Sequence, residues 1–350
     1  MKVFVTGAGA LLGQGIIKSL CLAETKYTII AADPNPHAVG LYWADKAYLI
    51  PMADSEEYLE RIWSILKAEK PEVILIGTDV ELLIFAENKD FIENNTGSHV
   101  IVSPPQVIRI ADDKWLTYKF LKENGFPYPQ SVLADEADRL VQSCGFPLIV
   151  KPRRGARSAG VRTVRNEHEL REALQATSEP IIQECVADAH HEYTSGVLTL
   201  GTEIRSVVTM RRDLRDGNTY RAYVLPGFEA NDMLAEIAKR LRGFGPLNLQ
   251  FRMDDGQPKV FEINARFSGT TPLRAYAGFN EVDFMIRYVV KGERIPPPKL
   301  SPKILLRYLD EIIIEPGSYE HLVYKKQGEN LSFTKPGHHL SRGNNDDERI

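Results

Sequence analysis

The stretch from Leu247 to Ser268, LNLQFRMDDGQPKVFEINARFS, decides how the second half of this chain folds. Its alternation of apolar and polar residues predicts two short strands joined by the tight turn DDGQP, centred on Gly256. With that centre, Gln250 lies across from Glu262, and Asn264 follows two residues later on the same face. The opposite face is expected to pack into a core with the side chains of Leu249, Phe251, Phe261 and Ile263.

The polar face of this hairpin is unusual because it gathers a carboxylate between two amides. Gln250, Glu262 and Asn264 offer oxygen ligands of the kind that Mg²⁺ prefers, with further positions left for water and phosphate oxygens. An ordinary antiparallel hairpin also has one solvated polar face. The hairpin alone therefore leaves a metal site and a solvated surface as alternatives.

Length and composition describe a globular chain with room for two or three domains. It has 350 residues, of which 43% are hydrophobic and 26% charged, and its net charge is −4. This charge argues against a general binder of nucleic acids or membrane surfaces. Cys21, Cys144 and Cys185 show no CxxC spacing, which favours a reducing compartment and no zinc site. No signal peptide or membrane span is expected, so we predict a cytoplasmic location.

Residues 1–111 alternate short apolar strands with helices, which predicts an α/β unit with a doubly wound, mostly parallel sheet. The first crossover, GAGALLG at 7–13, is one residue off the G-x-G-x-x-G spacing, and Asp33 ends the second strand. A dinucleotide site is one interpretation. The other is that these glycines only permit a tight strand-to-helix turn.

The rest of the chain is expected to form a catalytic unit with mixed α+β structure and a C-terminal extension. Asp112 and Asp113 resemble the N-cap of a helix that leads to the boundary GFPYP at 125–129. We place the second domain at 112–298, with a small lobe at about 130–184 and a large lobe at about 185–298. Residues 299–350 form the extension, and its last ten residues are expected to be a solvated tail.

The sequence KPRRGARSAGV at 151–161 predicts a strand that delivers Lys151 into a basic loop. Gly155, Ser158 and Gly160 are small enough for backbone N–H groups to approach phosphate oxygens, with Lys151 supplying positive charge. The loop is not a Walker A motif, because a strand follows it and Gly-Lys-Ser/Thr is absent. The alternative is a basic surface hairpin.

A nucleotide would need an apolar slot for its base and a carboxylate for its ribose diol. The strand PIIQECV at 180–186 and the later EYT at 192–194 can supply them. Ile182, Val186 and Leu249 are candidates for the slot, and Glu192 is the candidate for the diol.

The ordered series of strand-Lys-Pro-loop, QE-x-V, EYT-x-x-V, LNLQF and EINARF resembles the ATP-grasp superfamily. The resemblance covers roughly residues 1–298 and is strongest to the branch that includes the large subunit of carbamoyl phosphate synthetase. It implies a Rossmann-like pre-ATP-grasp domain, which holds no dinucleotide, followed by a two-lobed ATP-grasp domain.

The resemblance also implies roles for individual residues. Lys114 and Lys151 would contact the phosphates of ATP, and the loop with Gly155, Ser158 and Gly160 would close over them. Glu184 and Val186 would meet the adenine edge through their backbone, and Glu192 would bind the ribose. Gln250, Glu262 and Asn264 would hold Mg²⁺ or Mn²⁺, and Arg266 would steady the transferred phosphate. Arg153, Arg154 and Arg157 depart from the more Gly- and Ser-rich loops of relatives.

The leading hypothesis is an ATP-dependent carboxylate–amine ligase that forms an acyl phosphate from its substrate acid. Its partners would be small molecules, with a homodimer as one assembly that the family allows. Arg211, Arg212 and Arg215 are candidates for a substrate carboxylate, or else solvated surface arginines. Asp79 and Glu81 are candidates for an amine at the sheet edge, although Asp79 also suits a helix N-cap. The alternatives are an NAD(P)-dependent oxidoreductase, with Tyr42–Lys46 or Tyr118–Lys122 as its Tyr-x-x-x-Lys, and a non-catalytic ATP-binding protein.

Overall fold

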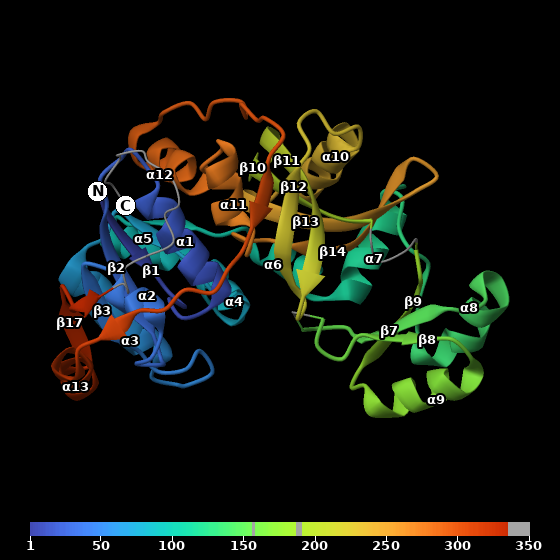
Figure 1. Ribbon diagram of the computed structural model, residues 1–350, viewed down its shortest axis with the longest axis horizontal. Helices are drawn as coiled ribbons and strands as arrows, with labels where there is room; N and C mark the ends of the chain where they lie inside the picture. Colours follow the sequence, from blue (N-terminus) through green and yellow to red (C-terminus); the bar gives the residue numbers. More distant parts are fainter. Residues whose placement is uncertain (156–157, 187–190, 335–350) are drawn as a thin grey trace, which may run out of the picture.

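The N-terminal unit is built on a six-stranded sheet at one end of the molecule (Figure 1). The computed structural model describes residues 1–155, 158–186 and 191–334. The strand order is β17-β3-β2-β1-β4-β5, in which β1 to β5 are parallel and β17 joins β3 antiparallel. The strands are β1 (Lys2–Val5), β2 (Thr28–Asp33), β3 (Lys46–Leu49), β4 (Val73–Leu75), β5 (His99–Ile101) and β17 (Gln327–Glu329). The predicted α/β unit with a mostly parallel sheet is confirmed.

Helices cover both faces of this sheet, because its strands are apolar on both sides. Phe4 and Ile30 face one buried cluster, whereas Val3 and Ile29 face the other. The helices are α1 (Leu11–Cys21), α2 (Val39–Tyr42), α3 (Tyr58–Glu69), α4 (Asp79–Glu87) and α5 (Lys89–Thr96). The doubly wound arrangement places the N-termini of α1 and α4 just beyond the carboxyl ends of β1 and β4.

Two helices connect the N-terminal unit to the rest of the chain. They are α6 (Pro105–Asp112) and α7 (Lys114–Glu123), and both pack against β14. The predicted cap between them is confirmed, since the side chain of Asp113 accepts hydrogen bonds from the backbone N–H groups of Trp115 and Leu116.

The small lobe is a four-stranded antiparallel sheet with its own core at the far end of the molecule (Figure 1). Its strand order is β6-β9-β7-β8, and its helices pack on the sheet. The elements are β6 (Ser131–Leu133), the 3₁₀ turn η1 (Ala134–Glu136), α8 (Ala137–Cys144), β7 (Leu148–Pro152), β8 (Arg162–Val164), α9 (Glu167–Ala176) and β9 (Pro180–Glu184). This sheet delivers Lys151 and Glu184 at neighbouring strands.

The large lobe is a six-stranded antiparallel sheet in the order β14-β13-β10-β11-β12-β15. Its strands are β10 (Glu192–Leu200), β11 (Glu203–Arg215), β12 (Asn218–Val224), β13 (Phe244–Asp254), β14 (Gln257–Asn264) and β15 (Ile304–Leu306). Its helices are α10 (Asn231–Leu241), α11 (Thr271–Ala277) and α12 (Glu281–Lys291). Thus β13 and β14 are the hairpin expected from the LNLQF and EINARF segments.

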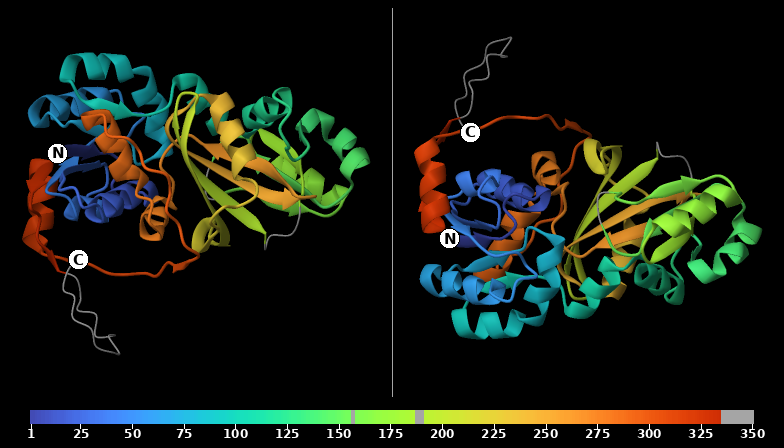
Figure 2. Two further views of the ribbon diagram at one scale, coloured as in Figure 1. Left: turned by 90° about the horizontal axis from the view of Figure 1, so that it is seen from above. Right: turned by 90° about the horizontal axis from the view of Figure 1, so that it is seen from below.

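The C-terminal segment runs from the large sheet back to the N-terminal sheet, along one side of the molecule (Figure 2). After β15 it contains β16 (Ile313–Ile314), α13 (Pro316–Lys325), β17 and β18 (Phe333–Thr334). It therefore joins both larger sheets rather than forming a separate unit. The expected solvated tail at 341–350 lies outside the described residues.

One expectation about the hairpin is wrong. Phe261 does not join Leu249, Phe251 and Ile263 in the buried cluster; Val260 takes that place. The reason is a register shift after Gln250, which pairs Phe251 with Val260 and leaves Phe261 without a direct partner. The bulge turns the phenyl ring of Phe261 toward Lys151 instead.

Candidate active site

The polar face of the hairpin forms one connected cluster. Gln250 pairs with Glu262 across the strands, and its Nε2 donates a hydrogen bond of 3.1 Å to Glu262 Oε1. Asn264 Nδ2 donates to the same oxygen at 2.9 Å. The cross-strand pairing expected from the sequence is confirmed, and it places one carboxylate between two amides.

The donor set of this cluster fits a hard cation. Both amide oxygens are held by arginines: Arg212 Nη2 lies 2.6 Å from Gln250 Oε1, and Arg266 Nη2 lies 2.9 Å from Asn264 Oδ1. Within the described residues, no group of three or more His, Cys, Asp or Glu side chains can hold a metal. A Mg²⁺ ion here would therefore rest on one carboxylate and amide oxygens, with its remaining ligands from water and phosphate.

Lys151 lies beside this cluster, brought there by β7. Its Nζ donates to Gln183 Oε1 at 2.8 Å and sits 5.5 Å from the centre of the Phe261 ring. Burial, reinforced by the nearby charge of Lys114, lowers the pKa of Lys151 to about 7. The ammonium is thus costly at this buried position, and an anion such as phosphate would stabilise it.

The basic loop is tied to the helix that follows the N-terminal unit. Lys114 Nζ donates to the carbonyl oxygen of Gly155 at 2.9 Å. Arg153 forms two hydrogen bonds with the carboxylate of Asp113, at 3.2 and 2.5 Å. These contacts fix the first residues of the loop to the start of α7.

After Arg153, the candidate phosphate loop is exposed to solvent. Gly155, Ser158 and Gly160 are exposed. All three have positive φ values, of 127°, 56° and 72°. The small residues permit this sharply turned backbone. Arg157, one of the three arginines that depart from the Gly- and Ser-rich loops of relatives, lies outside the described residues.

The candidate ribose carboxylate, Glu192, is buried between two arginines. Arg212 Nη2 lies 2.6 Å from Glu192 Oε1, and Arg252 Nη2 lies 3.1 Å from Glu192 Oε2. Arg252 also donates to the carbonyl oxygen of Val186 at 3.0 Å. The sequence analysis missed Arg252, although it lies two residues after Gln250 and a strand turns every second side chain to the same face.

Glu184 reaches the same region from β9. Its Oε1 lies 3.1 Å from Nζ of Lys259 on β14, and its Oε2 accepts from the backbone N–H of Gln130 at 2.9 Å. The ion pair with Lys259 joins the small lobe to the hairpin of the large lobe. Glu184 and Val186 therefore both contact basic residues of that hairpin.

Two of the three residues expected to form the apolar slot lie elsewhere. Leu249 is fully buried in the cluster on the far side of the hairpin, because it alternates with Gln250 along β13. Ile182 is fully buried in the core of the small lobe. Val186 is the one of the three near Glu192, because Arg252 contacts both residues; 7% of its surface is exposed.

A cavity of about 120 Å³ extends from this cluster toward the N-terminal unit. Gln250, Glu262 and Arg212 line it on the side of the hairpin. Arg266 also lines it, and its Nε lies 2.8 Å from Asp79 Oδ1. The other lining residues are Ala10, Leu11, Leu12, Thr78, Gly217, Asn218, Thr219, Asn248, Ser268, Gly269, Thr270 and Arg307. The N-terminal unit, the large lobe and the C-terminal segment therefore all contribute to this cavity.

The two acidic residues expected at the sheet edge have different positions. Asp79 is the first residue of α4, makes no side-chain cap, and faces the cavity. Glu81 is buried, and it accepts hydrogen bonds from Thr6 at 2.6 Å and from Tyr58 at 2.5 Å. The expectation that Glu81 meets an amine is therefore wrong, because the first turn of α4 directs it into the core.

The three candidate arginines of β11 also separate. Arg212 lines the cavity, as described above. Arg211 pairs with Asp213 at 3.1 Å and stacks on Tyr223, whereas Arg215 is exposed beside Asp216. Of the three, only Arg212 reaches the cavity, so Arg211 and Arg215 match the surface alternative.

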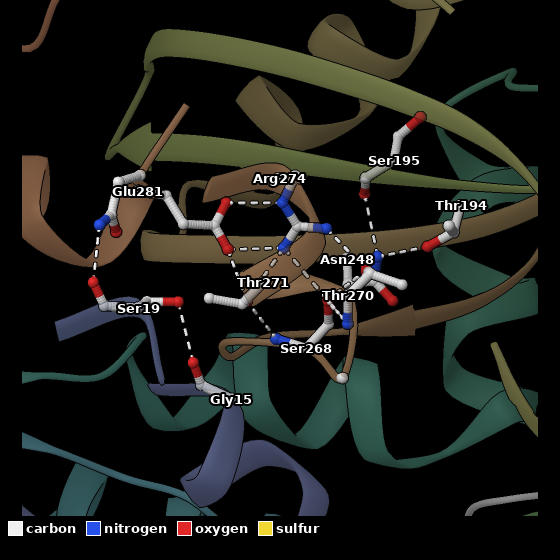
Figure 3. Close-up of polar contacts among 12 residues, drawn as sticks. Gly15, Ser19, Thr194, Ser195, Asn248, Ser268, Thr270, Thr271, Arg274 and Glu281 are labelled. Carbon is white, nitrogen blue, oxygen red and sulfur yellow. Dashed lines mark hydrogen bonds and ion pairs between the residues drawn. The ribbon is translucent and has the colours of Figure 1, made fainter. Parts of the chain in front are cut away.

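A buried ion pair supports the loop that lines one wall of the cavity (Figure 3). Arg274 Nη2 lies 2.5 Å from Glu281 Oε1, and both side chains are 1% exposed. The same guanidinium donates to the hydroxyls of Ser268 at 3.1 Å and Thr270 at 2.7 Å. Gly196 of β10 lets the guanidinium approach, because a Cβ there would lie 2.4 Å from it.

In the glycine-rich turn of the N-terminal unit, neighbouring protein atoms occupy the space next to the glycines. Asp33 Oδ2 accepts a hydrogen bond of 2.7 Å from the backbone N–H of Gly9. A Cβ at Gly9 would lie 2.7 Å from that of Ala38, and one at Gly13 would lie 2.1 Å from the carbonyl oxygen of Gly7. These glycines are needed for close packing, which accounts for the motif without a dinucleotide.

The candidate oxidoreductase pairs do not form an open site. The hydroxyl of Tyr42 donates to the carbonyl of Pro36, and Lys46 pairs with Glu69 and Glu329. In the second pair, Lys122 Nζ lies 3.3 Å from the hydroxyl of Tyr118 on α7, and neither residue lines the cavity.

Comparison with known families and structures agrees with the fold described above. A family model described as an ATP-grasp domain matches residues 111–270, and one described as a PylC-like N-terminal domain matches residues 5–101. The chain is 24% identical over 340 residues to the carbamoyl phosphate synthase large chain of Gemmatimonas aurantiaca, which covers 88% of this chain and 30% of the relative. It is 26% identical over 344 residues to the C-terminal section of that large chain from Methanocaldococcus jannaschii, covering 89% and 52%.

Solved structures share the fold at low identity. An N5-carboxyaminoimidazole synthetase from Staphylococcus aureus, complexed with ADP, superposes with a TM-score of 0.70 at 18% identity, over 93% of this chain and 85% of that one. The biotin carboxylase domain dimer of the Hydrogenobacter thermophilus 2-oxoglutarate carboxylase, in complex with MgADP, ADP and bicarbonate, gives a TM-score of 0.68 at 20% identity, over 90% and 75%. No helix in the described residues is long and apolar enough to cross a membrane.

Proposed function

We propose, because this chain belongs to the ATP-grasp superfamily, that it is a ligase that uses ATP to activate a carboxylate for attack by an amine. One observation carries the proposal: the Gln250–Glu262–Asn264 cluster is continuous, through Arg266, with a small charged cavity. A nucleotide phosphate at the cluster and a small acid in the cavity would then be neighbours. Phosphoryl transfer needs this positioning and charge neutralisation more than it needs a protein nucleophile.

The reaction has two steps. A carboxylate oxygen of the acid attacks the γ-phosphorus of ATP, the bond to the β–γ bridging oxygen breaks, and ADP leaves. The amine nitrogen then attacks the acyl carbon, phosphate departs with the C–O bond electrons, and the nitrogen loses its proton to solvent. No bond to a protein side chain is formed at any point.

The protein would position the phosphates and neutralise their charge. Lys151 and Lys114 would contact the phosphates of ATP, with Gly155, Ser158 and Gly160 in the loop over them. Glu262, Gln250 and Asn264 would hold Mg²⁺ or Mn²⁺, which supplies charge neutralisation at the phosphates when bound. Arg266 would stabilise charge on the transferred phosphate and the acyl phosphate.

The base and the ribose would lie between the lobes. Glu184 and Val186 would meet the adenine edge through their backbone, and Glu192 would bind the ribose. Arg252 contacts both Val186 and Glu192, so it would border the bound base and ribose.

The experiment is ADP release with Mg²⁺ across a panel of amino acids and small carboxylates, each combined with ammonia and simple amines. Lys151→Ala and Glu262→Ala should each lower ADP release by about 100-fold or more. Lys239→Ala and Glu236→Ala, which break an exposed ion pair on α10, are matched controls and should keep the wild-type rate. ATP binding without ADP release for any acid would instead indicate a non-catalytic ATP-binding protein.

The chain spans 30% to 52% of the length of the two carbamoyl phosphate synthase relatives above, so their reactions are not assigned to it. A cytoplasmic location, a homodimer, and the domain limits 1–111, 112–298 and 299–350 remain our predictions. Size-exclusion chromatography with light scattering tests the dimer directly.

A further inference from the structure

Arg307 is a basic residue in the cavity that sequence reasoning did not single out. It follows β15 in the C-terminal segment, and its guanidinium lines the cavity with Arg266 and Asp79. Its Nη2 donates to the carbonyl oxygen of Gly269, and its backbone N–H donates to that of Tyr220 at 3.0 Å. No carboxylate in the described part of the chain lies within ion-pair distance of it.

The other two arginines of the cavity each have a carboxylate partner. Arg212 lies 2.6 Å from Glu192, and Arg266 lies 2.8 Å from Asp79. Burial lowers the pKa of Arg307, so its surroundings penalise the positive charge without compensating it. A cation that is partly removed from water in this way is costly unless an anion pairs with it. Because no carboxylate of the described residues pairs with Arg307, an anionic ligand bound in the cavity would supply the missing partner.

The position of Arg307 is fixed at both ends of its segment. Upstream, β15 pairs with β12 through residues 304–306. Downstream, β17 pairs with β3 of the N-terminal sheet. Across the cavity, α1 begins without a side-chain cap at Ala10, so the positive end of its dipole also faces this space. The pairing of β15 and the hydrogen bond from the Arg307 backbone N–H to Tyr220 thus hold the backbone of Arg307 beside the cavity.

We propose that Arg307 binds a carboxylate that the reaction leaves intact, carried either by the acid substrate or by the amine substrate. This rests on the proposed function, because it assigns a second anionic group to a substrate of the same cavity. The volume of about 120 Å³ restricts that substrate to a small molecule. A dicarboxylic acid and an amino acid that acts as the amine are the two sources of such a group.

The test is calorimetric binding of small probes in the presence of Mg²⁺ and a non-hydrolysable ATP analogue. Succinate against propionate tests a second carboxylate on the acid, and glycine against methylamine tests one on the amine. Arg307→Met should weaken the binding of succinate or of glycine by roughly 10- to 100-fold, as expected for a lost charge-assisted hydrogen bond. Propionate and methylamine should bind Arg307→Met as they bind the wild type.

Two further variants separate recognition from structure. Lys303→Met removes an exposed cation four residues away, whose Nζ donates to the carbonyl of Tyr276, and should change no affinity. Arg307→Lys keeps the charge and should retain part of the preference for the carboxylate probes. If Arg307→Met does not fold, as judged by loss of analogue binding, the comparison of Arg307→Lys with the wild type decides instead.

Three results would overturn the proposal: wild-type affinity of Arg307→Met for succinate and glycine, equal loss for all four probes, or no binding of either carboxylate probe at millimolar concentration by the wild type. Failure of the wild type to bind the ATP analogue would contradict the proposed function instead. The same titrations without nucleotide would then still test Arg307.

Discussion

At the scale of single residues, the site depends on charges that are partly compensated within the chain. Glu262 accepts from two amides, and Glu192 from two arginines. Lys151 is different, because its partners are the neutral amide of Gln183 and the face of Phe261. Its surroundings favour the neutral amine, whereas bound phosphates would favour the ammonium.

This difference predicts that ATP binding takes up a proton at Lys151. Because the pKa of Lys151 in the free protein is about 7, the amine is increasingly neutral above that pH, and the phosphates would reprotonate it. Uptake should rise toward about one proton above pH 7, while affinity falls by up to about tenfold per pH unit. Calorimetry in buffers of different ionisation enthalpy measures the uptake. Lys151→Arg should bind without it, and equal uptake by this variant would contradict the assignment.

The same lowered pKa affects folding with a definite sign. The unfolded chain holds a proton on Lys151 up to its ordinary pKa of 10.5, whereas the folded chain releases it near 7. The unfolded state therefore binds more protons between these values, and Lys151 makes the protein more stable as pH rises across that window. In Lys151→Met this contribution should vanish, so its urea midpoint should gain less between pH 7 and pH 9. An equal gain in both proteins would count against it.

At the scale of elements, buried polar contacts fix the loop between β14 and α11. The Arg274–Glu281 pair holds Ser268 and Thr270 (Figure 3). The carbonyl of Gly269, between these two residues, accepts a hydrogen bond from Arg307. When one partner of a fully buried ion pair is removed, the other is left as an uncompensated charge in the core. The position of this wall of the cavity thus depends on the buried contact between Arg274 and Glu281.

Arg274→Met should therefore lower the free energy of unfolding by about 3–5 kcal/mol, because Glu281 would lose its partner in the core. The matched control is Arg287→Met, which removes a partly exposed arginine paired with Glu293 and Asp283 on α12. That change should cost only about 0–1 kcal/mol. Urea denaturation followed by circular dichroism compares the two, and a similar midpoint for both variants would refute the role of the pair.

At the scale of the whole molecule, the C-terminal segment links the two larger sheets across the cavity. It adds β15 to the large lobe and β17 to the N-terminal sheet. Between these two strands along the chain lies α13, whose Leu322 is fully buried. The small lobe, by contrast, projects from the rest with a core of its own (Figures 1 and 2). The proposed nucleotide site thus lies between the small lobe and the hairpin, whereas the cavity lies between the larger sheets.

Leu322→Ala should loosen this link without disturbing the nucleotide site. Losing a buried leucine side chain costs about 2–5 kcal/mol, here concentrated where α13 and β17 pack. Hydrogen exchange should rise in residues 313–334 and stay unchanged in β13 and β14, and affinity for an ATP analogue should not change. Faster exchange throughout the chain, or none at 313–334, would show that the segment is not a separately released link.

Much of this architecture could be predicted from local patterns. The alternation in β13 and β14 fixed the pairing of Gln250 with Glu262, and Asp113 had the form of an N-cap. The bulge that moved Phe261, and the burial of Glu81, depend on contacts between distant segments and left no local signal. The same holds for Arg307, whose role in the cavity arises only when β15 pairs with β12.

We propose that ATP activates a carboxylate at the site formed by Glu262, Lys151 and Arg266. The most direct test is the isotope content of the phosphate released when the protein turns over ATP with small acids labelled with ¹⁸O in the carboxylate, together with ammonia or an amine. We expect acid-dependent ADP release, with one labelled oxygen transferred from the acid to each phosphate. Unlabelled phosphate, or no acid-dependent ADP release from a protein that binds ATP, would contradict it.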